Sequence, residues 1–144
     1  MFLKLIIFTH IIAATIWTGG HLTLAIGFLP KALKKKDFTI IENFESKFEP
    51  IGIPALLVLV ATGIYMATVY TTNFFEFDFS DHHNKHIYIK LILLISTIAL
   101  ALHARFVLIP NRKLKPLSYH IILVTLLAVI FVFVGFSARS GGLL

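Results

Sequence analysis

Four long apolar segments divide this chain. They span about residues 2–29, 51–70, 86–109 and 117–136, and polar or basic stretches separate them. Each is long enough to cross a bilayer, since a helix needs about 20 apolar residues to do so. Helices are expected because lipid offers backbone polar groups no partners, and short connections make neighbouring helices antiparallel. The pattern predicts an all-α, integral membrane four-helix antiparallel bundle, with residues 1–144 as a single transmembrane domain.

A weaker periodic pattern lies between the first two segments. Apolar residues recur at helical spacing over residues 37–49, with glutamates and a lysine between them. This predicts a short amphipathic interfacial helix between the first and second membrane helices. Pro50 and Pro54 then fall in the opening turns of the second membrane helix, where proline is tolerated. Residues 71–85 are predicted to form a loop whose phenylalanines suit the membrane–water interface.

The distribution of lysine and arginine predicts the orientation. Nine of them lie in or beside the connections after the first and third segments: Lys31, Lys34, Lys35, Lys36, Lys47, Arg105, Arg112, Lys113 and Lys115. Four lie on the opposite side: Lys4, Lys85, Lys90 and Arg139. Because positive residues are retained in the cytoplasm, both basic connections are expected there. The N- and C-termini and the 71–85 loop are then outside.

Composition narrows the chemistry. The chain is 58% hydrophobic with a mean hydropathy of +0.89, which places it among membrane proteins. The net charge of +6 is explained by the basic residues that orient the helices in the membrane, so no nucleic-acid partner is expected. No cysteine is present, which excludes disulfides and thiolate metal sites, and the only methionines are Met1 and Met66. Because Cu(I) prefers sulfur ligands, this composition argues against a methionine ladder for copper transport.

The first apolar segment contains two histidines on one face. His10 and His21 are eleven residues apart, so they point within about 20° of each other and lie about 16 Å apart along the axis. Histidines in lipid are costly unless they face a protein interior or a bound group. Trp17 lies on the same stripe. Gly19 and Gly20 beside it allow close approach of a helix or a flat ligand.

Matching depths across antiparallel helices predicts two polar levels. The inner level, near the basic connections, holds three histidines from three helices: His21, His103 and His120. The outer level holds three polar residues: His10, Tyr65 and Lys90. A haem b group needs imidazoles and a flat apolar slot between helices, whereas copper would use the three inner histidines as a nitrogen-rich metal site. A purely structural bundle is the third reading.

The preferred haem site is the inner one. His21 and His103 would approach from opposite sides as an axial pair, with His120 as the alternative ligand or a hydrogen-bond partner of a propionate. On a straight helix Lys90 points about 140° away from His103, so both cannot face the core. If the outer site of His10 and Lys90 is the functional one, His103 must turn toward a neighbour or lipid.

Over most of its length the chain resembles the copper-resistance D (CopD-like) membrane family in its short, single-domain form. The resemblance rests on His10–Gly20, Thr62–Gly63, Ile89–Leu93 and Ala104–Pro110. It implies copper resistance or uptake at a bacterial inner membrane.

The patterns of the first and third helices are also similar to the four-helix bacterial protoporphyrinogen oxidase, a haem-associated membrane protein. That resemblance implies catalytic roles for His10 and Lys90 and leaves open a haem-dependent membrane oxidoreductase. The preferred function is haem b binding for membrane electron transfer or haem-linked oxidation, with Trp17, Gly20 and Tyr65 as further cofactor contacts. The expected partners are the lipid bilayer and a redox protein, quinone or porphyrin. Copper handling and a non-catalytic accessory subunit of a larger complex are the alternatives, and a homo-oligomer is also open.

Overall fold

The structure, a computed structural model, describes residues 1–71, 74–76 and 78–142. Its elements are α1 (Phe2–Leu22), η1 (Thr23–Phe28), α2 (Leu29–Lys35), α3 (Phe38–Tyr70), η2 (Phe74–Glu76), α4 (His82–His103), η3 (Ala104–Leu108) and α5 (Leu114–Arg139). η1 and η3 are π-helical turns that continue α1 and α4 without a break, and η2 is a 3₁₀ turn. The described residues contain no strand, so the all-α prediction is confirmed.

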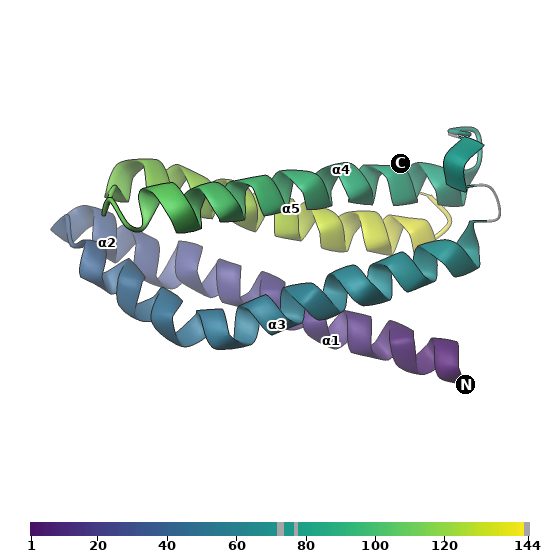
Figure 1. The fold of residues 1–144 in the computed structure, drawn as a ribbon, viewed down its shortest axis with the longest axis horizontal. Coiled ribbons are helices and arrows are strands. Elements are labelled where there is room, and N and C mark those ends of the chain that lie inside the picture. The colour runs from purple at the N-terminus through teal and green to yellow at the C-terminus, as the bar shows by residue number, and fades with distance from the viewer. Residues whose placement is uncertain (72–73, 77, 143–144) are drawn as a thin grey trace.

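Four helical rods lie side by side and alternate in direction (Figure 1). The rods are Phe2–Lys35, Phe38–Tyr70, His82–Leu108 and Leu114–Arg139, and each is long and apolar enough to span a membrane. The four predicted membrane helices are thus confirmed. Both termini lie at one end of the bundle, called the terminal end below. The opposite end, which carries the α2–α3 and η3–α5 connections, is called the basic end.

The predicted interfacial helix is present but is not a separate element. Residues 38–49 continue into the second membrane helix as one helix, α3, with Pro50 and Pro54 inside it. The apolar face of this first part does not lie on a bilayer surface, because Phe38 and Ile41 are buried in the bundle. Each proline lacks an N–H and so removes one hydrogen bond from the helix. α3 changes direction along its length in Figure 1, as expected at prolines.

The first rod ends later than predicted. Its helix passes Pro30, which is tolerated because it stands in the first turn of α2. Lys36 ends α2 with a left-handed backbone (φ 52°). The Asp37 side chain then accepts a hydrogen bond from the Thr39 N–H at 3.0 Å and caps α3.

Apolar packing is concentrated toward the basic end. A cluster of buried residues joins all four rods there: Leu24, Leu29, Ala32, Phe38, Ile41, Leu108, Leu117 and Ile121. A smaller cluster in the middle of the bundle holds Trp17, Val124 and Ala128. At the terminal end, several of the buried side chains are polar: Thr71, Asn84, His86 and Ser137.

Candidate functional site

His10 of α1 contacts α3 toward the terminal end. Its Nδ1 lies 2.7 Å from the Thr62 hydroxyl, which donates its own hydrogen to the Val58 carbonyl. The His10 Nδ1–H is therefore the donor to Thr62, and Nε2 keeps its lone pair. The ring also lies close to Gly63, where an added Cβ would be 3.6 Å from Cε1. This contact fixes the tautomer and leaves one nitrogen free to act as a ligand or a base.

Lys90 of α4 extends toward α5. A Cβ added at Gly135 would lie 3.3 Å from the Lys90 Nζ, so the missing side chain leaves room for the ammonium group. Lys90 and Arg139 are close enough to His10 to interact with it electrostatically. The predicted outer residues His10 and Lys90 therefore lie within electrostatic reach of each other, and Arg139 adds a second positive charge. A negatively charged group would be favoured beside this imidazole.

The other residues near this level have different neighbours. Tyr65, predicted to contact a cofactor, is exposed, and its ring meets that of Phe2 at a centroid distance of 5.6 Å. His86 is buried, donates its Nδ1–H to the His82 carbonyl at 2.6 Å and accepts from the Ser137 hydroxyl at 3.2 Å. Both nitrogens of His86 are thus used: Nδ1 bonds within α4, and Nε2 holds α4 against α5.

Two of the three inner histidines form a pair. His103 Nδ1 lies 2.8 Å from His120 Nε2, which joins α4 to α5. His120 Nδ1 lies 3.1 Å from the Pro116 carbonyl and donates its hydrogen to it. His120 Nε2 is therefore the acceptor, and His103 Nδ1–H is the donor. His103 is exposed on the outside of the bundle, with its Nε2 lone pair unused in the described residues.

His21 does not join that pair. Its Nδ1–H donates to the Trp17 carbonyl at 2.8 Å, and its ring lies 4.3 Å from the Trp17 ring and 5.7 Å from that of Phe48. No hydrogen bond or ring contact links it to His103 or His120 within the described residues. The pairing of His21 and His103 as axial ligands therefore stays a prediction. α4 is rotated so that Lys90 is partly buried and His103 is exposed.

The structure also bears on the predicted three-histidine metal site. Across the described ranges, no group of three or more His, Cys, Asp or Glu side chains has an arrangement that would hold a metal ion. What remains of the predicted site is the two-nitrogen pair of His103 and His120.

Trp17 and Gly20 serve packing. The Trp17 ring is buried in the middle cluster against Val124 and Ala128. A Cβ added at Gly20 would lie 2.1 Å from a ring carbon of Phe48, so the close approach predicted at this glycine is made by a phenylalanine of α3. Both were predicted to contact a cofactor, and in the structure their space is filled by protein.

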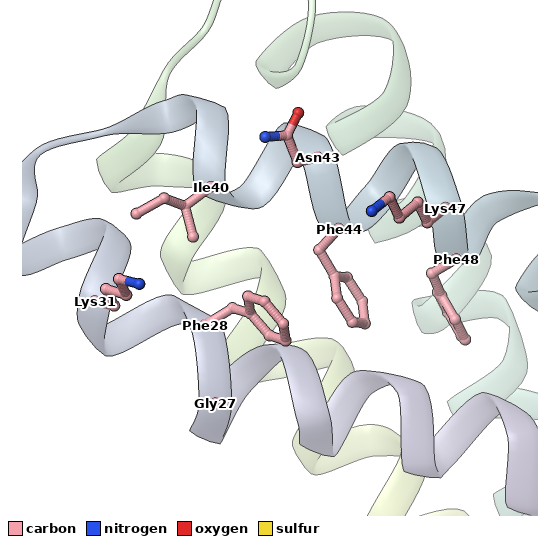
Figure 2. Close-up of a pocket in the computed structure, with 8 residues that line it drawn as sticks. All are labelled: Gly27, Phe28, Lys31, Ile40, Asn43, Phe44, Lys47 and Phe48. Carbon is pink, nitrogen blue, oxygen red and sulfur yellow. The ribbon is translucent and has the colours of Figure 1, made fainter.

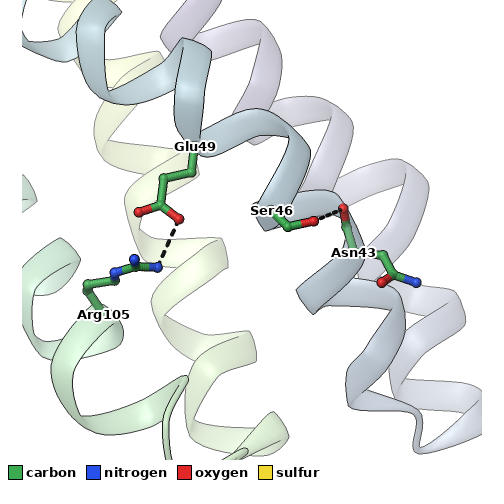
Figure 3. Close-up of polar contacts among 4 residues, drawn as sticks. All are labelled: Asn43, Ser46, Glu49 and Arg105. Carbon is green, nitrogen blue, oxygen red and sulfur yellow. Dashed lines mark hydrogen bonds and ion pairs between the residues drawn. The ribbon is translucent and has the colours of Figure 1, made fainter.

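Ion pairs join α3 to the α4–α5 connection at the basic end. Arg105 Nη1 lies 2.8 Å from a carboxylate oxygen of Glu49 (Figure 3), and Arg112 pairs with Glu42. The Arg105 side chain is 54% exposed, so the contribution of its pair to stability is small.

Two residues of the outer site were not predicted as its components. Thr62 fixes the His10 tautomer, and Gly135 makes room for Lys90. The available signals were the small Thr62–Gly63 step in α3 and an isolated glycine in the otherwise bulky α5. Neither signal reveals the partner side chain without the rotation of the helices.

The fold and its two levels of histidines define a multi-pass helical membrane protein with imidazoles placed between its helices. The sequence profile of the family described as copper resistance protein D matches residues 42–138. Because this match covers more than half of the chain, the protein belongs to the copper resistance protein D family. The matched residues include Lys90, His103 and His120, whereas His10 and His21 precede them.

No curated protein and no solved structure matches the chain. The resemblance to protoporphyrinogen oxidase gains no support from these comparisons and stays a prediction.

Proposed function

We propose that the protein handles copper in the membrane, in resistance or uptake, and that His103 and His120 bind the ion. The observation that carries the proposal is their 2.8 Å contact across α4 and α5, inside the residues that match the family. Imidazole nitrogens suit copper, and the ion would replace the hydrogen bond between the two rings, because a nitrogen that carries a proton cannot be a ligand. The exposure of His103 makes the pair accessible at the basic end of the bundle.

Copper binding by the pair is tested with the purified protein in mild detergent. Cu(I) affinity is measured by competition with a chromophoric chelator for wild type, His103→Ala and His120→Ala. His83→Ala is the matched control, since this histidine is also exposed but lies at the terminal end. We expect each pair variant to lose at least about tenfold in affinity, because losing even a hydrogen-bond partner of a metal ligand costs about 10–100-fold. Equal affinity in all four proteins would remove the pair as the copper site.

A role in copper handling is tested separately in cells. Expression of the wild-type chain should change copper accumulation or tolerance, and the His103→Ala variant should not. No change with the wild-type protein would contradict copper handling itself, whatever the purified protein binds.

Haem b binding at the terminal end is a second candidate function, and the surroundings of His10 favour it. The His10 Nδ1–H donates to Thr62, which leaves Nε2 as the candidate ligand atom, and Lys90 and Arg139 place positive charge nearby. That charge would repel a bare metal cation but would suit the propionates of an iron porphyrin. When bound, haem would supply one-electron chemistry. His10 would ligate it, and Lys90 would be placed to bind a propionate or transfer a proton.

The optical spectrum tests whether the protein binds haem and which histidine holds it. Reduced-minus-oxidised spectra are recorded for wild type, His10→Ala, His21→Ala and His103→Ala purified in mild detergent. Loss of the haem signal in His10→Ala alone would support the outer site, and loss in both His21→Ala and His103→Ala would support the inner one instead. A colourless wild-type protein would remove haem. If that protein is also free of metal, the result supports the alternative that the protein is a non-catalytic accessory subunit.

We further propose that the protein lies in a bacterial inner membrane with its basic end in the cytoplasm and both termini outside. The charge asymmetry between the two sides supports this orientation.

A further inference from the structure

A groove opens on the side of the bundle near the basic end, and none of its lining residues is a histidine. Its volume is about 520 Å³, and it lies between the end of the first rod and the first turns of α3. Figure 2 shows its walls, which include Gly27, Phe28 and Lys31 on one side and Phe44, Lys47 and Phe48 on the other.

Local sequence explains why the groove is open and apolar. η1 ends at Gly27 and Phe28, and a Cβ added at Gly27 would meet nothing within 4 Å. The Phe28 and Phe44 rings lie 5.0 Å apart, and the Phe44 and Phe48 rings stack at 5.6 Å. Three phenyl rings therefore form a continuous apolar floor that runs from the first rod onto α3.

Two positive charges stand at the edge of this floor. Lys31 of α2 and Lys47 of α3 are both exposed, and neither forms an ion pair within the described residues. In Figure 2 the Phe28 and Phe44 rings lie between the two lysines. Lys34, Lys35 and Lys36 follow directly at the end of the same rod and add positive charge to this region.

We propose that the groove binds one anionic phospholipid, with an acyl chain on the three phenyl rings and the headgroup phosphate between Lys31 and Lys47. Charge complementarity carries the proposal: an apolar surface ending at two unpaired lysines, on helices that span a bilayer, matches an acyl chain joined to a phosphate. Basic pockets between membrane helices are a known form of headgroup site. The groove shares no residue with the proposed copper or haem sites, so this inference stands or falls independently of them.

The test compares lipids of different charge on the full chain. Wild-type protein in neutral detergent is titrated with phosphatidylglycerol and with phosphatidylcholine of the same acyl chains, and bound lipid is counted by native mass spectrometry. One phosphatidylglycerol should bind at least about tenfold more tightly than phosphatidylcholine, because each lysine near the headgroup favours it by about 1 kcal/mol. Equal binding of the two lipids would overturn the proposal.

Matched variants separate the groove from diffuse charge. Lys31→Gln/Lys47→Gln should lose most of the preference for phosphatidylglycerol. The control Lys34→Gln/Lys35→Gln removes the same charge from α2 outside the groove and should keep the preference. Equal loss in both double variants would show nonspecific attraction and contradict the site.

A third variant tests the apolar floor. Gly27→Leu adds an apolar side chain whose Cβ meets nothing within 4 Å, and it should weaken the binding of both lipids by about tenfold. The thermal unfolding midpoint of each variant shows that it is folded, and unchanged lipid binding by folded Gly27→Leu protein would contradict the groove as the acyl-chain site.

Discussion

The two ends of the bundle are held together differently. At the basic end, buried apolar side chains from all four rods form one cluster, and the charged groups pair on the surface, as Arg105 does with Glu49. At the terminal end, polar side chains turn inward and hydrogen bond between helices, as His10 does with Thr62 and His86 with Ser137.

The two ends therefore have different roles: one holds the helices in position, and the other orients polar side chains between them. A packed apolar cluster is well suited to fix the relative positions of helices, because small changes of volume are costly there. Polar contacts between helices contribute less to stability in a membrane but set which nitrogen of a histidine is free. The basic end thus acts as the scaffold, and the proposed copper ligands His103 and His120 lie on its outside. The terminal end holds the His10 imidazole, whose tautomer is set by Thr62.

The orientation of the two ends has the largest expected effect, because the result is all or none. The chain has no native cysteine, so Lys34→Cys and His82→Cys mark the two ends without background. We expect an impermeant thiol reagent added outside intact cells to label His82→Cys and to leave Lys34→Cys unlabelled until the cells are opened. The opposite pattern would reverse the proposed topology.

Packing at Gly20 should give the largest change in stability. The Phe48 ring lies against this glycine and also against Gly52, so a methyl group added at Gly20 would overlap the ring unless it shifted. Gly20→Ala should lower the free energy of unfolding by about 1–3 kcal/mol, the usual cost of overpacking. The measurement is the unfolding midpoint in detergent.

The neighbouring Gly19 is the control for that variant. An added Cβ there meets nothing within 4 Å, so Gly19→Ala should leave the midpoint unchanged or raise it slightly. Equal losses in both variants would mean that the Phe48 contact is not the cause.

The polar contact at the terminal end should matter less for stability. Thr62→Val keeps the shape and removes the acceptor of the His10 Nδ1–H, at a cost of about 1 kcal/mol, typical of hydrogen bonds between membrane helices. Thr15→Val is the matched control, because the exposed Thr15 hydroxyl bonds only to the Ile11 carbonyl of its own helix. The unfolding midpoints should differ, and a larger loss in Thr15→Val would contradict the role of Thr62.

The surface ion pair should have the smallest effect. Removing the charge with Glu49→Gln should cost about 0–1 kcal/mol, because the Arg105 partner is half exposed. A double-mutant cycle with Arg105→Gln, run at low and high salt, measures the coupling. A coupling above about 2 kcal/mol that survives high salt would show that this pair belongs to the scaffold.

The sequence was sufficient for the helices but not for their rotation. The four apolar segments predicted the four rods because length and hydropathy are properties of each segment alone. Pairing depends on which face each helix turns inward. The 140° separation of Lys90 and His103 indicated that only one could face the core, but the choice between them came from packing against Gly135 and His120.

Two other features depend on contacts between distant residues. The apolar face of residues 38–49 was predicted from its period, yet the same period suits a bilayer surface and a protein core, and burial of Phe38 and Ile41 decided for the core. The proton positions on His10 and His120 are set by Thr62 and by the Pro116 carbonyl. No pattern in a single segment gives the proton position on His10, because Thr62 lies on another helix.

X-ray absorption at the copper K edge tests the central claim most directly. Purified protein loaded with one equivalent of Cu(I) should show two imidazole nitrogens around the metal and no sulfur, and the His103→Ala/His120→Ala double variant should lose both while His103→Ala loses one. The chain offers only Met1 and Met66 as sulfur donors, so a sulfur contribution would place the copper elsewhere. Imidazole scattering that is unchanged in His103→Ala would equally contradict binding by the His103–His120 pair.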